Sequence, residues 1–325
     1  MDYSHSPQFN NSTKRFENPN GEKIDRGFLE VFKVASNYIK RDYDEWENKG
    51  FPSINPSKED LADFSESVIW IGHSTVLINH KGVTALTDPH FTKRAGPFGM
   101  MGPKRITPPP FNIENLPKID IILISHNHYD HLDKQSIIQL LQNQPRIKFF
   151  VPLGLSPILR SFGATEISEV DWWQSVEFGG VNIQSTQVQH WSRRSFFDRN
   201  KTLWSGWMMS WEDFSFYFTG DSGFSGDFIK TAQRCGNPTL AAIPIGAYDP
   251  REFMKVAHMN PEEAVRTFQD LGAKYAFAIH WGTFKLSLEP MDEPPMQLNR
   301  SLEKAGIHHS KFKCLKHGEQ WRSPF

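Results

Sequence analysis

The sequence is poor in cysteine and in excess charge, and each shortage excludes a class of protein. Among 325 residues there are two cysteines, Cys235 and Cys314, which argues against a secreted fold held by disulfides and favours a reducing compartment. One bridge between the two stays open at this point. The formal net charge is −1 and no long basic run occurs, so we expect no broad nucleic-acid-binding surface.

Long apolar runs are also missing. No run is long enough to cross a bilayer, and the polar start of the chain lacks the apolar core of a signal peptide. The composition of residues 1–22 predicts a disordered N-terminal arm, and residues 23–325 are sufficient for one large domain with a sizeable core. Together with the absence of repeats, these features predict a single-domain cytoplasmic protein.

Metal-binding side chains are instead concentrated in one short segment. Three imidazoles and a carboxylate fall within six residues, in the order His126, His128, Asp130 and His131. Both ligand types suit zinc and its first-row neighbours. The first two histidines are offset by two and point the same way in an extended loop, whereas the other pair follows at a turn. The pattern therefore suits two metals rather than one.

Further ligand candidates stand at the ends of other predicted strands. His190, Asp221 and His280 each follow an apolar, strand-like run. Taken singly, such residues are more often hydrogen-bonded histidines or turn carboxylates. Their shared position at the carboxyl end of a strand, where α/β proteins often place their chemistry, favours one common site.

Strand-like runs crowd before the histidine cluster and alternate with helices after it. The predicted strands are residues 67–71, 75–79, 83–87, 119–124, 181–189, 214–219 and 275–279. The predicted helices are residues 134–142, 261–271 and 296–305. From the pattern alone the fold is a mixture of α and β.

The motif His-x-His-x-Asp-His, followed by single His, Asp and His candidates, resembles the metallo-β-lactamase superfamily. Longer stretches are similar to the N-acylphosphatidylethanolamine-hydrolysing phospholipase D family, and the similarity runs from about Val68 to Glu319. These stretches are residues 101–105, 151–155, 171–173, 242–248, 260–265, 279–284 and 315–319. The resemblance implies an α/β fold of the metallo-β-lactamase type, an αββα sandwich of two β-sheets flanked by helices.

The resemblance also distributes the ligands and implies an activity. One Zn²⁺ is expected to take His126, His128 and His190. The second is expected to take Asp130, His131 and His280, with Asp221 bridging the two ions. Two such cations lower the pKa of a shared water, and the hydroxide attacks the phosphorus of a phosphodiester. The expected reaction is that of a phospholipase D, which releases N-acylethanolamine and leaves phosphatidic acid, with Asp130 and Asp221 as catalytic residues.

Residues around the ligands have weaker expected roles. The family residue that matches His258 acts on the substrate, and the alternative is a histidine packed against the start of the helix that follows. The family usually has Gln before this position, whereas Ala257 lacks that hydrogen-bonding group, which bears on headgroup preference. Asp88 and His73 are expected to support the ligands, with a turn carboxylate and a structural hydrogen bond as the alternatives. His90 has no counterpart in the family pattern and receives no role.

Two segments are candidates for contact with lipid. Loop 93–105 carries Phe98, Met100 and Met101 among four basic residues, which suits an anionic membrane surface but also a flexible active-site loop. Residues 25–50 show a helical pattern that fits either a helix docked on the core or a lipid-facing one. By resemblance, Phe98, Met101 and Tyr248 contact the substrate, a phospholipid at a membrane surface. A homodimer is suggested by the family alone.

Two other functions stay open. A different metallohydrolase of the superfamily would cleave a soluble phosphodiester, a lactone or a nucleic acid without any lipid. A non-catalytic lipid-binding protein would keep the fold, but a binding module has no need for a metal pair with an open coordination position. The metal is open as well, because the ligand types suit zinc best but admit iron or manganese.

Overall fold

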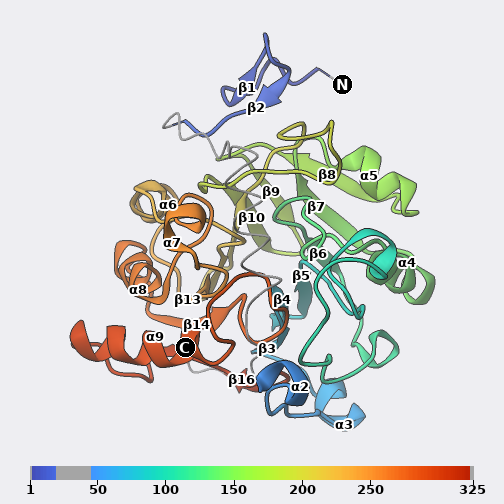
Figure 1. Cartoon of the computed structure of the whole chain (residues 1–325). Coiled ribbons are helices and arrows are strands. Elements are labelled where there is room, and N and C mark those ends of the chain that lie inside the picture. Colours follow the sequence, from blue (N-terminus) through green and yellow to red (C-terminus); the bar gives the residue numbers. More distant parts are fainter. Residues whose placement is uncertain (1, 20–44, 323–325) are drawn as a thin grey trace.

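Two facing β-sheets form the centre of the molecule in the computed structural model, which describes residues 2–19 and 45–322 (Figure 1). One seven-stranded sheet runs, in spatial order, β16 (Gln320–Arg322), β3 (Ser67–Gly72), β4 (Thr75–His80), β5 (Val83–Thr87), β6 (Ile121–Leu123), β7 (Lys148–Pro152) and β8 (Ile167–Val170). The other runs β15 (Phe312–Lys313), β14 (Tyr275–Ile279), β13 (Leu240–Pro244), β12 (Ser215–Phe218), β11 (Gly206–Ser210), β10 (Val181–Thr186) and β9 (Ser175–Phe178).

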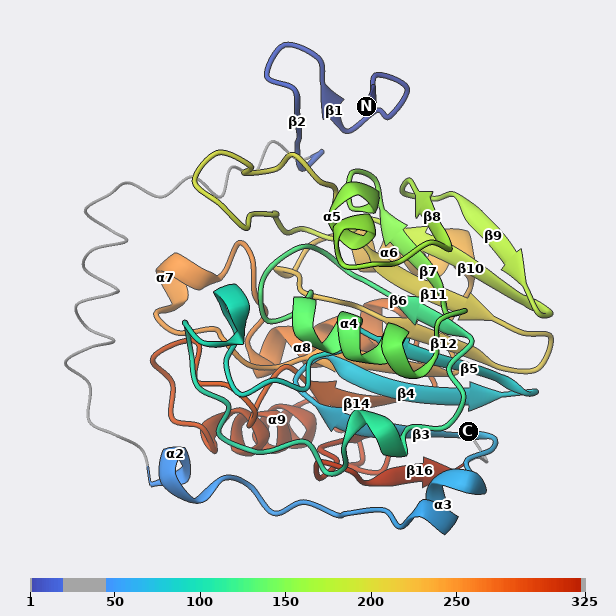
Figure 2. The same ribbon diagram turned by 90° about the vertical axis from the view of Figure 1, so that its right-hand side faces the viewer.

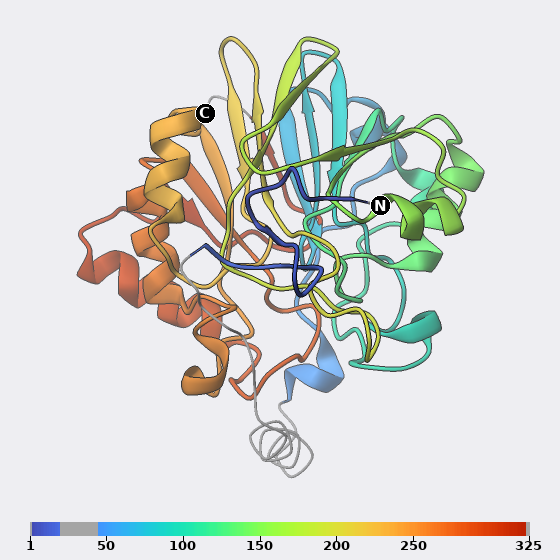
Figure 3. The ribbon, with the colours of Figure 1, turned by 90° about the horizontal axis from the view of Figure 1, so that it is seen from above.

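Helices cover the outer face of each sheet. The helices of the described residues are α2 (Trp46–Lys49), α3 (Lys58–Ala62), α4 (Lys134–Asn143), α5 (Ser156–Ser161), α6 (Asp227–Cys235), α7 (Arg251–Met254), α8 (Pro261–Asp270) and α9 (Glu293–Lys304), with short 3-10 turns η1 (Pro97–Gly99) and η2 (Ile113–Asn115). Seen from above, α6, α8 and α9 lie outside one sheet and α4 and α5 outside the other (Figure 3). The layers therefore run helix, sheet, sheet, helix, and the predicted αββα sandwich is confirmed.

The core lies between the two sheets. Trp70 from one sheet and Phe218 and Phe277 from the other are fully buried in the same cluster. A second cluster fills the space under the helices, where Leu140 of α4 packs with Ile122 of β6. Each large side chain removed from water contributes about 1.5–3 kcal/mol, so these two layers hold the strand ends in fixed positions.

Most predicted element boundaries agree with the structure to within a few residues. The largest shift among the strands is at β10, which ends at Thr186 although the apolar pattern continues to residue 189. Beyond Thr186 the chain leaves the sheet, and Gln189 pairs instead with Gly223, which follows β12. Helix α9 begins at Glu293, three residues before the predicted start, because prolines are tolerated in a first helical turn. The two cysteines are free, so the bridge left open by the sequence is absent.

The N-terminal arm differs from its prediction. Residues 2–19, expected to be disordered, contain a short antiparallel hairpin of β1 (Phe9–Asn10) and β2 (Arg15–Phe16). Phe16 is completely buried, and its N–H donates to the carbonyl of Asn200 at 2.8 Å. Tyr3 packs on the same core, and its hydroxyl lies 3.2 Å from Glu169. The segment is polar on average, but its few aromatic side chains are sufficient to hold it against the core. Of the helical pattern predicted over residues 25–50, residues 25–44 lie outside the described residues.

Candidate metal centre

The histidine-rich segment forms the turn between β6 and α4. The N–H groups of His131 and Leu132 donate to the carbonyl of His128, which closes the turn. Asp133 then caps α4 by accepting the N–H of Ser136 at 3.0 Å. Because the turn is fastened at both ends, four candidate ligands are presented at one end of the sandwich, on the left-hand side of Figure 2.

The other candidates reach this turn from the second sheet. His190, Asp221 and His280 follow β10, β12 and β14, whose carboxyl ends lie beside the turn. The chain after β12 can lie this close to the turn only because residue 220 is a glycine. Its φ is +63°, and an added Cβ would lie 2.7 Å from the Cβ of Ser125. His280 itself adopts φ +62°, a left-handed conformation that is uncommon for residues other than glycine and that concentrates at functional sites.

Three imidazoles form the first ligand group. The Nε2 atom of His126 lies 2.7 Å from the Nδ1 atom of His128, and that Nδ1 atom lies 3.3 Å from the Nε2 atom of His190. All three nitrogens fall within one sphere that could hold a metal ion. Two of these side chains are almost fully buried, so the nitrogens face one another rather than bulk water.

Asp130, His131 and His280 form the second group. The Oδ2 atom of Asp130 lies 3.4 Å from the Nε2 atom of His131 and 3.5 Å from that of His280. These ligand atoms also fall within one sphere that could hold a metal ion, and His73 belongs to the same cluster.

Asp221 lies between the two groups. Its Oδ2 atom is 3.1 Å from the Nε2 atom of His131 and 3.2 Å from that of His280, and it is 3.9 Å from the Nε2 atom of His190. One carboxylate thus approaches both sets of imidazoles, which is the position that a bridging ligand requires. The structure brings together all the residues predicted as metal ligands.

The chemistry of the cluster fits metal ions. The Nε2 atoms of His131 and His280 and the Oδ1 atom of Asp221 are buried, yet within the described residues they make no hydrogen bond. Buried polar atoms in proteins are nearly always satisfied, so an unsatisfied group of this kind needs an explanation. Convergence on a common cation explains why these atoms lie close together without donating to one another.

The carboxylates and the imidazoles of the cluster shift one another's pKa values. Burial opposes ionisation of Asp221, but the imidazoles of His131 and His280 outweigh it and hold the pKa of that carboxyl well below its usual range. Burial lowers the pKa of His128 to about 4 and that of His126 well below its ordinary value, so both rings are unprotonated and free to bind. The carboxylate of Asp221 overcomes burial at His280 and raises its pKa to about 9.

A layer of supporting groups orients the ligands. Asp88 is completely buried, and its Oδ2 atom lies 2.7 Å from the Nδ1 atom of His131. The same carboxylate accepts the N–H of Ser125 at 2.7 Å and its hydroxyl at 2.5 Å. Such contacts fix the tautomer and the ring orientation of a ligand histidine. His73 supports the other side, where its Nε2 atom lies 3.0 Å from the Oδ2 atom of Asp130.

Of the residues predicted to contact the substrate, some lie beside the metal centre and others do not. His258 adjoins the centre, with its Nδ1 atom 3.8 Å from the Oδ2 atom of Asp221 and 15% of its side chain exposed. Tyr248 is turned elsewhere and donates its hydroxyl to Glu293 at 2.8 Å. Met101 is 62% exposed on loop 93–105, and the side chain of Phe98 lies outside the described part of the structure. Substrate contact by these residues stays a prediction.

Three polar residues near the centre received no role from the sequence. Ser125 links Asp88 to His126, whose Nδ1 atom lies 2.9 Å from its hydroxyl, and its position beside the cluster was the available signal. His90 is completely buried, and its Nδ1 atom lies 3.1 Å from the guanidinium of Arg105. Nothing local in the sequence connects His90 with Arg105, because the rest of loop 93–105 lies between them in the chain.

Comparison with known proteins agrees with the fold. Residues 84–281 match the family model described as the beta-lactamase superfamily domain. A metallo hydrolase from Ignicoccus hospitalis superposes with a TM-score of 0.60 at 19% identity, covering 80% of this chain and 98% of that one. A possible metal-dependent hydrolase from Veillonella parvula gives 0.64 at 17% identity, covering 80% and 100%. The family model places the chain in the beta-lactamase superfamily, and the two solved structures share its fold.

Two curated relatives narrow the class. N-acyl-phosphatidylethanolamine-hydrolyzing phospholipase D 1 of Caenorhabditis elegans is 36% identical over 314 residues, which is 91% of this chain and 88% of that protein. The mitochondrial enzyme of the same name from Saccharomyces cerevisiae is 36% identical over 245 residues, 73% of this chain and 52% of that protein. The chain belongs to the N-acylphosphatidylethanolamine-hydrolysing phospholipase D family. Within the described residues, no helix has the length and apolarity needed to span a membrane.

Proposed function

We propose that this protein is a dizinc phosphodiesterase of the phospholipase D type. Its substrate is an N-acylphosphatidylethanolamine-like phospholipid, and its products are an N-acylethanolamine and phosphatidic acid. The observation that carries the proposal is the position of Asp221 between two complete ligand groups. The relatives in worm and yeast, which are named for this reaction, support the choice of substrate.

The two metal sites follow from the ligand groups. His126, His128 and His190 would hold one ion, while Asp130, His131 and His280 would hold the other. When bound, the ions supply a hydroxide near neutral pH and neutralise charge on the phosphoryl oxygens. The chain contributes the carboxylates of Asp130 and Asp221, whose negative charge sets the net charge of the centre.

His258 is the side chain placed to contact the substrate. It lies next to Asp221 but in neither ligand group, and it is partly exposed. Burial lowers the pKa of its imidazole to about 4, so the ring is neutral at physiological pH and offers one N–H donor. A donor in this position can stabilise a phosphoryl oxygen as charge develops on it.

The position before His258 bears on the headgroup. Ala257 is buried, and its carbonyl oxygen lies 3.0 Å from the Nδ1 atom of His190, so the backbone here supports a ligand. Its methyl group offers no hydrogen bond, in contrast to the glutamine usual in the family. We therefore expect the headgroup to be recognised less strictly here than in members with glutamine.

The direct test uses purified protein with N-acylphosphatidylethanolamine in mixed micelles and identifies the products by mass spectrometry, with and without a chelator. We expect chelator-sensitive release of N-acylethanolamine and phosphatidic acid, and loss of that release in Asp221→Ala. Asp63→Asn is a control, because Asp63 is 76% exposed and lies 3.5 Å from Arg322, away from the centre.

Other products would change the assignment in defined ways. Free fatty acid with a lysolipid would move the cleaved bond and reject the phospholipase D type. Hydrolysis of bis(p-nitrophenyl) phosphate without any activity on lipid would instead indicate a soluble phosphodiester as the substrate. Lipid binding that survives Asp221→Ala, in the absence of any turnover, would indicate a non-catalytic protein.

A further inference from the structure

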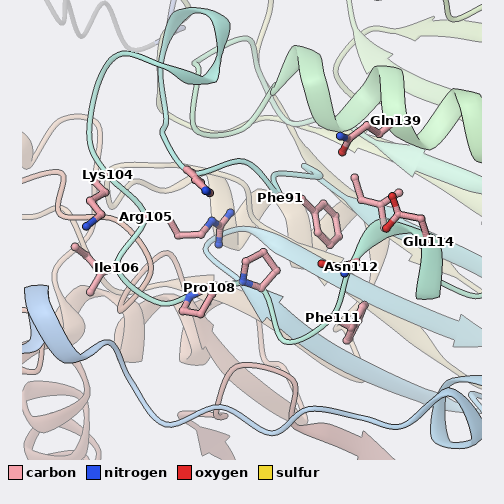
Figure 4. Close-up of a pocket in the computed structure, with 12 residues that line it drawn as sticks. Phe91, Lys104, Arg105, Ile106, Pro108, Phe111, Asn112, Glu114 and Gln139 are labelled. Carbon is pink, nitrogen blue, oxygen red and sulfur yellow. The ribbon is translucent and has the colours of Figure 1, made fainter.

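A second hollow lies on the side of the molecule that carries loop 93–105. Its volume is about 560 Å³, within the range of roughly 300–1,000 Å³ that is usual for small-molecule sites. The wall is formed by both ends of the loop, by the segment that leads into η2, and by Gln139 of α4 (Figure 4). None of the candidate metal ligands belongs to this wall, so the hollow is separate from the metal centre.

The two sides of this pocket differ in chemistry. Lys93, Lys104 and Arg105 contribute positive charge, and Figure 4 shows Lys104 and Arg105 together on one side. Figure 4 shows Phe91 and Phe111 toward the other side, and the apolar side chain of Ile113 also lines the pocket.

Arg105 is buried and forms no ion pair with the residues that the structure describes. Its side chain is 7% exposed, its Nε atom donates to the carbonyl of Thr92 at 2.9 Å, and its Nη2 atom donates to the carbonyl of His90 at 2.5 Å. The guanidinium carbon lies 4.6 Å from the ring centre of Phe284, and the Nη1 atom makes no hydrogen bond to any described residue. All of these partners are neutral.

The two lysines of the pocket, Lys93 and Lys104, likewise have no ion-pair partner among the described residues. Within the described residues, no carboxylate lies within ion-pair distance of Lys93, Lys104 or Arg105. The lining has a single acidic side chain, Glu114, which Figure 4 places on the side away from Arg105. Burial lowers the pKa of Arg105 to about 9, opposed in part by the negative charge of Asp133, so its guanidinium is still charged at neutral pH. A buried cation without a partner is costly, and an anion that enters from solvent offsets that cost.

We propose that this pocket binds an anionic amphiphile with a single acyl chain, whose phosphate or carboxylate head lies against Lys93, Lys104 and Arg105 and whose chain lies along Phe91, Phe111 and Ile113. The basic wall selects the negative head, since charge-assisted contacts are the stronger hydrogen bonds. The apolar wall selects a chain over a free inorganic anion, because burying apolar surface contributes binding energy in proportion to area. A fatty acid and a lysophosphatidic acid both have this chemistry.

The pocket is physically connected to the metal centre. Arg105 and His90 both pack on Phe284, and the ring of Phe284 lies 5.2 Å from that of His73. His73 in turn contacts Asp130. The binding site itself does not depend on the reaction proposed above, so a failure to bind amphiphile would leave that reaction untouched.

The test measures binding to the zinc-loaded protein by isothermal titration calorimetry. The probes are dodecyl phosphate and decanoate below their critical micelle concentrations, with dodecyl maltoside as a neutral amphiphile and inorganic phosphate as a head without a chain. We expect saturable binding of the two anionic amphiphiles, and at least tenfold weaker binding of maltoside and of inorganic phosphate. The relative affinities of the two anionic probes identify which head the site prefers.

Two variants separate this pocket from the metal centre, which also attracts phosphate. The double variant Lys93→Gln with Lys104→Gln should bind both anionic probes at least tenfold more weakly. The exposed pair Lys201→Gln with Lys316→Gln removes the same charge and is the control. Gln139→Trp should weaken binding of the anionic probes as well, because it fills the pocket from exposed helix surface and leaves the charges in place. Unchanged affinity in both pocket variants, or equal affinity for dodecyl maltoside or inorganic phosphate, would overturn the proposal.

Discussion

The support given by Asp88 to the second ligand group leads to a quantitative prediction. The Oδ2 atom of this buried carboxylate lies 2.7 Å from the Nδ1 atom of His131 and accepts the hydroxyl of Ser125. In Asp88→Asn the shape is kept, and the amide oxygen still accepts the N–H of Ser125. The amide nitrogen, however, cannot accept a hydrogen bond from His131.

The size of the effect on the second ligand group follows from the lost contact with His131, although the amide nitrogen also cannot accept the hydroxyl of Ser125. A hydrogen bond to a charged group contributes about 1.5–3 kcal/mol. Since every 1.4 kcal/mol is a factor of ten, zinc affinity at the group that contains His131 should fall about 10- to 100-fold. The group that contains His126 should be spared, because the hydroxyl of Ser125 still accepts from its Nδ1 atom.

The assay is competition for zinc with a chromophoric chelator, combined with turnover on the lipid substrate. We expect one zinc per chain to be held as in the wild type and one to be weakened, with kcat/KM reduced by the same factor. Circular dichroism and a thermal melt show whether the variant is folded, and Asp213→Asn provides a solvent-exposed control of equal charge. A folded Asp88→Asn protein that holds two zinc ions with wild-type affinity would falsify the proposed support of His131.

Three further predictions concern other parts of the site. Asp221→Ala removes the oxygen that we propose as a bridge, so plasma mass spectrometry should find fewer than two zinc ions per chain and turnover should vanish. A variant with full metal content and full activity would contradict a bridging role of Asp221. In His258→Ala the metal content should stay unchanged while kcat falls about 100-fold, as expected for loss of a positioned donor, and an unchanged kcat would assign this histidine to packing. In Asn18→Ala the bond from Nδ2 to the carbonyl of His190 is lost, which should cost about 1 kcal/mol and lower the Tm by about 1–2 °C; an unaltered melt would show that the arm does not stabilise this ligand.

The cluster from His126 to His131 could be predicted because its members are neighbours in the chain. A buried strand before them and a helix cap after them are both visible in the local pattern, and the turn between is then confined to a few residues. The strands that precede His190 and His280 could be predicted for the same reason. Their apolar runs are long enough to indicate a buried strand from the local sequence, without knowledge of any distant contact.

The disorder predicted for the N-terminal arm was wrong for a complementary reason. Phe16 is hidden only because it meets a surface formed by residues almost two hundred positions later, near Asn200. A prediction from composition does not include such contacts and depends only on the polar residues that form most of the arm. A segment with few aromatic side chains docks if the rest of the fold provides a place for them, and that place is not encoded locally.

The sequence by itself thus indicated the candidate ligands, their positions after strands and a mixture of strands and helices, because propensity and periodicity act over a few residues. Only the tertiary structure decided that Asp221 lies within 4 Å of imidazoles from both groups, that Asp88 lies under His131, and that Arg105 is buried with no ion pair to any described residue. Each of these arrangements joins residues that lie far apart in the chain or on either side of an irregular loop. Such contacts depend on how the two sheets and their loops pack together, since the path of the chain between them leaves no periodic signal.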